Sequence, residues 1–434
     1  MTARQISRRS FLGKVGLGAA GAGVAFYGPW KHNHVHAAKA DKSILIGLTT
    51  DASGQYGNSG ESERRGMLMA IAEFNKKGGV LGRQIETIHI DTETTPATGT
   101  RVAERMITRH EVAFLMGAVS SGVANAISLV AQRYGVVYLN TNSSSPTESG
   151  KDCHRVKFVW DGNGTNFGMA TVEGAIKAVG KNWVLFTNDY VWGHAVSKTV
   201  RNLVTQYGGR VVEEMVIPVG TRDFSSYLLK LQQVKPDVVN TAVGGDDIKA
   251  LRTQVGQLGM GNKPAWVGNQ QDWPDVYGLP LTSLFGVFGT TWYYKLDLPG
   301  VKEFVASYQK MFPNAPIKVP GNVFYNGYMA TRELLRAVER AGSTNNIKVI
   351  KELENLKVSA TERMQHYDAY MNPATHQMQQ TVYLATANDE AAWKANNDDL
   401  FKILAWSKPQ DVEDTDAPKA CKLESYEATP SYEM

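Results

Sequence analysis

The chain reads Ile44-Leu45-Ile46-Gly47-Leu48 near its start, then passes through a glycine-containing loop into residues 62–75. Within 62–75 the apolar residues Met67, Leu68 and Ile71 recur at helical spacing. A short apolar run bounded by turn residues predicts a buried strand, and the following periodicity predicts a helix. This strand–loop–helix unit decides the fold, because the rest of the chain repeats it.

The repeats form two series. In the first, strands are expected at 44–48, 85–90, 113–116 and 136–139, and helices at 62–75, 98–109 and 123–134. In the second, strands are expected at 183–187, 211–217, 238–241 and 265–267, and helices at 193–207, 224–234 and 247–258. Strict alternation gives a parallel sheet covered by helices. The sequence therefore predicts an α/β protein of two doubly wound parallel-sheet lobes joined by a hinge, with ligand loops at the carboxyl ends of the strands.

The later part of the chain is expected to be shared between the two lobes. Lobe 1 would comprise 41–160 and about 290–365, and lobe 2 would comprise 161–289 and about 366–410. Residues 411–434 carry no apolar period and are rich in Pro, Asp, Glu and Lys, so we expect an extended C-terminal tail.

The N-terminus has the features of an export signal. It contains Arg8-Arg9 followed by Phe11-Leu12, an Ala- and Gly-rich stretch over 15–27, and Ala38-Lys39-Ala40. This pattern favours a twin-arginine signal peptide at residues 1–40, the alternative being an ordinary secretory peptide. The apolar stretch is too short and too rich in Gly to remain as a membrane anchor. We therefore expect a periplasmic mature protein that does not span the membrane.

The charge of the chain argues against nucleic acid as a partner. The formal net charge is +4, but residues 1–40 hold six of the 46 basic residues and no acidic ones. The mature chain would carry 40 basic and 42 acidic residues, without the basic stripe that phosphate backbones require. Since no phosphate-binding glycine loop or metal-ligand cluster stands out either, no cofactor is expected.

The chain has two cysteines, Cys153 and Cys421. They are too few for a zinc site of the Cys-x-x-Cys type. In the oxidising periplasm they would either pair, tying the tail to the body of the protein, or remain as two buried thiols. The sequence leaves both alternatives open.

Several motifs of the mature chain are shared with one known family. They are Gly54-Gln55-Tyr56-Gly57, Arg65-Gly66, Gly117-Ala118-Val119-Ser120-Ser121-Gly122, Asp189-Tyr190-Val191-Trp192-Gly193 and Lys235-Pro236-Asp237. The chain resembles type I periplasmic binding proteins, the leucine/isoleucine/valine-binding family of ABC transporters, and its residues 188–239 are most similar to the urea and short-chain amide branch. The resemblance implies a monomeric solute-binding protein that closes its lobes over a small polar solute and delivers it to an inner-membrane permease.

The resemblance assigns three ligand-binding positions to lobe 1. In the family, the residue that corresponds to Ser121 binds the ligand's carboxylate. The loop residues that correspond to Asn142 and Ser144 bind the ligand together with it. Ser120 and Ser121 would open a helix, whose unpaired N–H groups and dipole suit a carboxylate or amide oxygen. The alternatives are a plain helix cap for Ser121 and a solvated turn for the loop containing Asn142 and Ser144.

Further ligand positions are expected on both sides of the cleft. In the resemblance, Tyr56 and Trp192 match aromatic rings that pack on the ligand from opposite lobes, although either ring would equally suit a core. Gly244 and Asp246 follow a strand and open a helix, so Gly244 would allow close approach to a ligand. Asp246 would accept a hydrogen bond from the ligand or, as the stronger expectation, cap the helix.

Gln270 is the position that departs from the family. Amino-acid-binding members place there a glutamate that pairs with the ligand's ammonium group. An unpaired ammonium group in a closed cleft costs several kcal/mol, so an α-amino acid is disfavoured unless Asp272 or Asp246 supplies the charge. An amide, a urea-like solute or a small aromatic carboxylate then becomes plausible.

Two rival functions use the same sequence features. Ala118-Val119-Ser120-Ser121-Gly122 resembles a degenerate nucleophile elbow of a serine hydrolase, with His194, His366 or His376 as the required base. The first glycine of that motif is missing, so we expect no enzyme. A periplasmic sensor with the same two-lobed fold is the other alternative.

Overall fold

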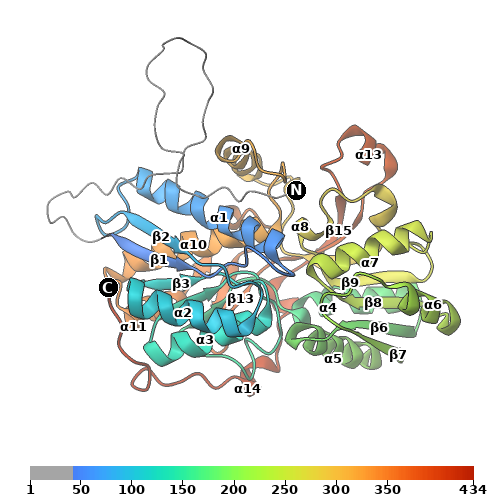
Figure 1. Cartoon of the computed structure of the whole chain (residues 1–434), viewed down its shortest axis with the longest axis horizontal. Helices are drawn as coiled ribbons and strands as arrows, with labels where there is room; N and C mark the ends of the chain where they lie inside the picture. Colours follow the sequence, from blue (N-terminus) through green and yellow to red (C-terminus); the bar gives the residue numbers. More distant parts are fainter. Residues whose placement is uncertain (1–42) are drawn as a thin grey trace, which may run out of the picture. The chain divides into compact units, whose positions relative to one another are not determined.

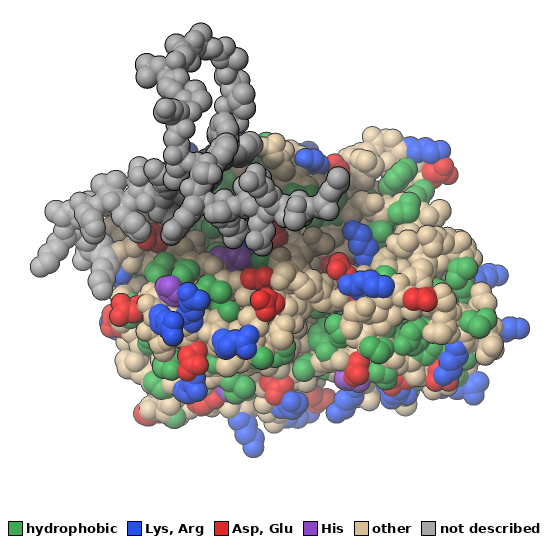
Figure 2. All heavy atoms as spheres, viewed as in Figure 1, with side chains coloured by type: hydrophobic (Ala, Val, Ile, Leu, Met, Phe, Trp, Pro, Cys, Tyr) green, Lys and Arg blue, Asp and Glu red, His purple; other side chains and the backbone are tan. Residues whose placement is uncertain are grey.

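The computed structural model describes residues 43–434. The expected signal peptide, residues 1–40, lies outside the described residues. Within residues 43–434 no helix is both long enough and apolar enough to cross a membrane. On the face shown in Figure 2, basic and acidic side chains are intermingled rather than gathered into one charged stripe.

The first lobe is built on an eight-stranded sheet in the order β11-β12-β13-β5-β4-β3-β1-β2. Strands β13, β5, β4, β3, β1 and β2 pair in parallel, whereas β11 and β12 add antiparallel pairs at one edge. The strands are β1 (Ile44–Leu48), β2 (Ile85–His89), β3 (Phe114–Met116), β4 (Val137–Asn140), β5 (Lys157–Val159), β11 (Lys357–Val358), β12 (Ala369–Asn372) and β13 (Gln377–Gln379).

Helices cover both faces of this sheet (Figure 1). Helix α1 (Gly57–Lys76) packs against α10 (Asn322–Ala341), and α2 (Pro96–His110) packs against α3 (Ser121–Tyr134). The first pair approaches closely because it meets at glycines. A Cβ on Gly66 would lie 2.1 Å from the carbonyl oxygen of Phe324, and a Cβ on Gly327 would lie 2.4 Å from that of Glu63. The Arg65-Gly66 motif therefore serves helix packing.

The second lobe is built on a seven-stranded sheet in the order β15-β14-β10-β9-β8-β6-β7. Its five strands from β10 to β7 are parallel, and β14 and β15 are antiparallel additions. The strands are β6 (Asn182–Asn188), β7 (Arg210–Ile217), β8 (Val238–Ala242), β9 (Ala265–Gln270), β10 (Val287–Thr290), β14 (Val382–Ala387) and β15 (Phe401–Ser407). Two doubly wound α/β lobes, as expected, are thus confirmed.

Alternate residues of strand β6 serve different cores. Val184 and Phe186 join one cluster, with residues of α6 (Ser225–Val234) and α7 (Gly245–Gln257), and Leu185 joins another, with residues of α4 (Gly164–Ala178) and α5 (Val191–Gln206). This alternation follows from the two-residue period of a strand.

Helix α4 was not expected from the sequence. It begins with a capping box, in which Asn163 accepts the backbone N–H groups of Thr165 and Asn166.

The chain returns to the second sheet later than expected. The boundary at about residue 366 falls before β12 and β13, which belong to the first sheet, and β14 starts the return at Val382. The reason is that β13 pairs in parallel with β5 and β12 pairs with β13. A strand pattern alone does not tell which sheet edge the strand joins.

The remaining helices are α8 (Trp273–Val276), α9 (Val301–Met311), α11 (Asn346–Glu354), α12 (Ala360–Arg363), α13 (Glu390–Ala395) and α14 (Ala417–Ala420).

The C-terminal tail is fastened to the first lobe. Cys421 forms a disulfide with Cys153, at a sequence separation of 268. Beyond it, the guanidinium group of Arg155 donates to the carbonyl oxygen of Glu424 at 2.7 Å, and the Tyr432 hydroxyl donates to the carbonyl oxygen of Val112 at 2.8 Å. The tail therefore acts as a strap on the folded body.

Replacing both cysteines by serine is expected to lower the free energy of unfolding by about 2–5 kcal/mol, because the crosslink restricts a very long loop of the unfolded chain. Guanidinium denaturation of the oxidised mature protein and of the Cys153→Ser/Cys421→Ser variant measures the difference. The reduced wild-type protein is the control and should resemble the variant. Equal midpoints for all three would contradict a stabilising strap.

Candidate functional site

Residues from both lobes line a narrow cavity near the carboxyl ends of the two sheets. The lining residues are Tyr56, Val119, Asn142, Ser144, Tyr190, Trp192, Val243, Gly244, Gln270, Gln271, Asp272 and Asp275. The free volume is about 20 Å³, which is room for about one water molecule. The two lobes are therefore closed on each other, and a larger solute requires them to move apart.

Direct hydrogen bonds join the lobes across this cavity. The Ser144 hydroxyl donates to Oε1 of Gln270 at 2.5 Å. The Gln55 side chain donates to the carbonyl oxygen of Gly244 at 2.8 Å, and the hydroxyls of Tyr56 and Tyr190 share a hydrogen bond. These contacts span 126–189 residues of sequence, so they form only when both lobes are folded and closed.

The side chain of Gln270 is held by hydrogen bonds at every atom that can form them. Its Nε2 donates to Asp161 Oδ2 at 2.8 Å and to Asp272 Oδ1 at 2.9 Å, while its Oε1 accepts from Ser144. A glutamate here would place a third carboxylate beside two others. The Gln therefore separates two acidic groups, which explains in physical terms the departure from the family at this position.

The carboxyl groups around Gln270 are buried. Burial raises the pKa of Asp161 to about 8 and that of Asp272 to about 6, and burial followed by the Asp272 charge raises the pKa of Asp275 to about 8. Among the twelve lining residues there is no Lys, Arg or His. The cavity therefore offers carboxyl oxygens as hydrogen-bond acceptors, without a basic side chain among its lining residues.

The N-terminus of α3 is occupied by a side chain of the protein. The carboxylate of Asp51 accepts the backbone N–H of Val119 at 3.1 Å and also that of Ser120. Ser120 and Ser121 are buried but do not line the cavity, and within residues 43–434 the Ser121 hydroxyl has no hydrogen-bond partner. The structure thus places the carboxyl group of Asp51 against the turn that leads into Ser121.

Asn142 lines the cavity, but its amide group is directed at α1. Its Nδ2 donates to Glu63 Oε2 at 2.7 Å and to the carbonyl oxygen of Val323 at 3.2 Å. Glu63 also accepts from the Thr141 hydroxyl at 2.5 Å, and burial raises its pKa to about 8. Asn142 therefore connects the ligand loop to α1 and α10.

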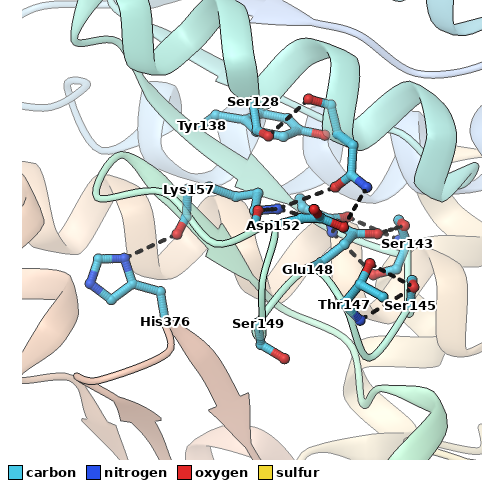
Figure 3. A network of polar contacts seen from close by, with 12 residues as sticks. Ser128, Tyr138, Ser143, Ser145, Thr147, Glu148, Ser149, Asp152, Lys157 and His376 are labelled. Atoms are coloured by element: carbon cyan, nitrogen blue, oxygen red, sulfur yellow. Dashed lines mark hydrogen bonds and ion pairs between the residues drawn. The ribbon is translucent and has the colours of Figure 1, made fainter. Parts of the chain in front are cut away.

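A buried polar network supports the same loop from behind (Figure 3). Glu148 accepts from the side chains of Asn140 and Ser143. The Lys157 ammonium lies 3.9 Å from Glu148 Oε2 and donates to the carbonyl oxygen of Asp152 at 2.7 Å. These contacts hold the chain on both sides of Ser144, at Asn140 and Ser143 and at Asp152. They thereby position Ser144 at the cavity.

On the second lobe the acidic residue at the cavity differs from the expected one. Asp246 is half-exposed and pairs with Arg222 at 3.3 Å, away from the cavity lining. The cap of α7 is Gly244, so the expected capping role of Asp246 was wrong. Asp275 lines the cavity instead, where it accepts the backbone N–H of Gly245 at 3.0 Å. The sequence analysis missed it, although it lies on a short helix that follows strand β9.

Three aromatic rings complete the lining. Tyr190 lies between the other two, with ring centroids 6.4 Å from Tyr56 and 6.0 Å from Trp192. Trp192 is 7% exposed, and its indole N–H has no hydrogen-bond partner. Tyr56 and Trp192 are brought together as expected, and Tyr190 was missed although it lies two residues before Trp192 in the same motif.

The described residues contain no group of three or more His, Cys, Asp and Glu side chains that could hold a metal ion. The three histidines considered for a hydrolase are engaged elsewhere. His194 contacts Asp189, His366 contacts the Tyr383 hydroxyl, and His376 contacts Glu354.

Comparisons with known proteins agree with this architecture. Residues 43–392 match the family described as periplasmic binding protein. The Leu/Ile/Val-binding protein homolog 7 of Brucella suis is 27% identical over 350 residues, covering 76% of this chain and 86% of that protein. A periplasmic binding protein from Burkholderia mallei has a TM-score of 0.79 at 25% identity, covering 86% of this chain and 96% of that one.

A third similar structure is a solute-binding protein of an ABC transporter from Rhodopseudomonas palustris BisB5, in complex with 3,4-dihydroxybenzoic acid. Its TM-score is 0.76 at 19% identity, covering 85% of this chain and 98% of that one, which supports the fold. The chain belongs to the periplasmic binding protein family, type I. Its function is that of a periplasmic solute-binding component of an ABC transporter, as the sequence predicted.

The buried carboxyl groups are expected to make stability depend on pH. Glu63, Asp161 and Asp275 hold their protons to about pH 8 in the folded state, whereas the unfolded chain releases them near its ordinary values of 4.5 and 3.8. The unfolded state then binds fewer protons between these values, so the free energy of unfolding should fall as pH rises from 5 to 8.

Glu63→Gln is expected to reduce this slope by up to about 1.4 kcal/mol per pH unit. Urea denaturation of the mature protein at pH 5, 6, 7 and 8 measures it. Glu86→Gln, at an exposed position of β2, is the matched control and should keep the wild-type slope. An unchanged slope in Glu63→Gln would show that the Glu63 carboxyl group is ionised in the folded state.

Proposed function

We propose that the cavity between the lobes is the place where this protein captures its solute. Ser144 and Tyr56 contribute from the first lobe, and Trp192, Tyr190 and Gln270 from the second. The observation that carries this assignment is the pair of direct hydrogen bonds across the cavity, from Ser144 to Gln270 and between Tyr56 and Tyr190. A solute between them would stabilise the closed form, which a permease can distinguish from the open form.

The solute classes considered from the sequence are not equally suited to this cavity. A small aromatic carboxylate would meet the carboxyl groups of Asp272 and Asp275 and no basic side chain in the lining. Solutes that present N–H donors match these acceptors. We therefore favour an amino compound, an amide or a urea-like solute, captured by a monomer that a twin-arginine signal has exported.

The cavity supports binding rather than hydrolysis. A serine nucleophile requires a histidine within hydrogen-bond reach. Ser120 does not line the cavity, and His194, His366 and His376 have other partners. The arrangement therefore gives no support to the hydrolase alternative.

A thermal-shift screen of the ligand-stripped mature protein against amino acids, amides, urea and aromatic carboxylates tests the proposed function. A solute at a hundred times its Kd should stabilise the native state by about 2.7 kcal/mol. It should also reduce the radius of gyration in small-angle scattering as the lobes close. Absence of both effects for every class would contradict solute capture in this cavity.

A pair of serine variants locates the site. Ser144→Ala is expected to weaken binding of the identified solute by about tenfold, because it removes a hydrogen bond that joins the lobes. Ser121→Ala is the matched variant, and it should bind nearly as the wild type does, because Ser121 does not line the cavity. The reverse order, measured by titration calorimetry, would favour the carboxylate site that the resemblance places at Ser121.

A further inference from the structure

The carboxyl groups of Asp272 and Asp275 line the cavity without a basic side chain in the same lining. Asp272 accepts hydrogen bonds from Gln270 and from Asn322, both at its Oδ1. Asp275 accepts from the Ser59 hydroxyl at 3.2 Å and from a backbone N–H. All these donors are uncharged. Buried carboxylates are strongly stabilised when a cation enters beside them, since desolvation otherwise disfavours their ionised forms.

Two buried arginines interact electrostatically with the acidic groups of this region, Arg252 with Asp275 and Arg363 with Asp161, but both donate their hydrogen bonds elsewhere. Arg252 donates to Gln271 Oε1 at 3.0 Å and to the carbonyl oxygen of Phe285 at 3.0 Å. Arg363 donates to the side chains of Gln365 and Gln380. Neither arginine lines the cavity, so the position beside Asp272 and Asp275 is left to the solute.

The turn before α3 carries a carboxyl group of the protein, which disfavours a carboxylate on the solute. The backbone N–H groups of Val119 and Ser120 donate to Asp51. A second carboxylate would have to displace that of Asp51 or lie beside it, and both arrangements cost free energy because like charges repel. Two N–H groups just before α3 are therefore already bonded within the protein.

The aromatic residues supply the remaining recognition elements. The faces of Tyr56, Tyr190 and Trp192 suit a cation, since aromatic rings attract positive charge. Trp192 lines the cavity, and within residues 43–434 its buried indole N–H has no partner, so it suits an uncharged acceptor such as an amide or hydroxyl oxygen. The cavity thus combines acceptors for a cation with one donor for an oxygen.

We infer that the solute is a small organic cation that carries an amide or hydroxyl oxygen and no carboxylate. This inference rests on the proposed function and narrows it. The cationic group binds beside Asp272 and Asp275, and the neutral oxygen accepts from Trp192. Such a solute carries the ammonium charge of an amino acid without its carboxylate.

Four compounds of similar size test the two charges separately: propionamide has neither, propionate has the carboxylate, alanine has both, and alaninamide has the cation alone. We expect alaninamide to bind at least about tenfold more tightly than propionamide at pH 6.5, in calorimetry and thermal shift, a difference of about 1.4 kcal/mol. Alanine should bind more weakly than alaninamide, and propionate most weakly.

Substitutions of the lining residues test whether the preference for a cationic solute arises in the cavity. Asp272→Asn and Asp275→Asn should each reduce the ratio of alaninamide to propionamide affinity to below about threefold, while propionamide affinity changes little. Asp246→Asn, outside the cavity lining, should keep the wild-type ratio. Thermal melts of each variant without solute show whether it is folded, and the wild-type ranking of the four compounds decides the inference even if an Asn variant fails to fold.

The outcomes separate this inference from the proposed function. Equal or tighter binding of propionamide, alanine or propionate would overturn the cationic solute while leaving solute capture in place. No binding of alaninamide up to 50 mM would also overturn it. Failure of the proposed function has a different signature, in which no solute of the wider screen produces either a thermal shift or lobe closure.

Discussion

The cleft depends on one physical constraint: buried carboxyl groups must be hydrogen-bonded when no cation lies beside them. Asp51 satisfies this constraint at the N-terminus of α3, and Glu63 satisfies it through Thr141 and Asn142. Asp161 and Asp272 share the amide of Gln270. Each of these bonds fixes one loop at the edge of a sheet. The hydrogen bonds of these buried carboxyl groups therefore both shape the cavity and hold its loops in fixed conformations.

The same constraint connects the two lobes. Gln270 bonds to two carboxyl groups and still accepts from Ser144 on the facing loop. That loop is itself held by Glu148 and Lys157, which are almost fully buried. A rigid loop on one lobe thus meets an oriented amide on the other. Closure requires little ordering of side chains, which keeps the free-energy cost of binding low.

The sequence predicted the fold more fully than the site. Strand runs such as Ile44–Leu48 and the helix expected at 224–234 carry their signals locally, and the structure has them at Ile44–Leu48 and Ser225–Val234. The strand Gln377–Gln379 does not, because its pairing with β5 is decided by contacts over 200 residues apart. Likewise Tyr56, Ser144 and Trp192 were found from motifs. Asp275 was missed because it reaches the cavity through the fold and has no motif of its own.

Some site residues were assigned to the solute although their hydrogen bonds are made within the protein. The amide of Asn142 is directed at Glu63, and the N–H of Ser120 is taken by Asp51. Residue type and position indicate that a polar group lies near the cleft, but not which way it points. The direction depends on the acidic partners Asp51 and Glu63, which come from the β1 loop and from α1.

The strap also limits how the two lobes can separate. Val412 accepts a hydrogen bond at 2.6 Å from Asn166 on α4 of the second lobe, while the adjacent Glu413 accepts one at 2.7 Å from Tyr370 on β12 of the first. Two bonded neighbours cannot travel far apart. If both contacts persist, the rotation axis for opening passes near this point, and the strap works as a pivot around which the mouth of the cavity swings.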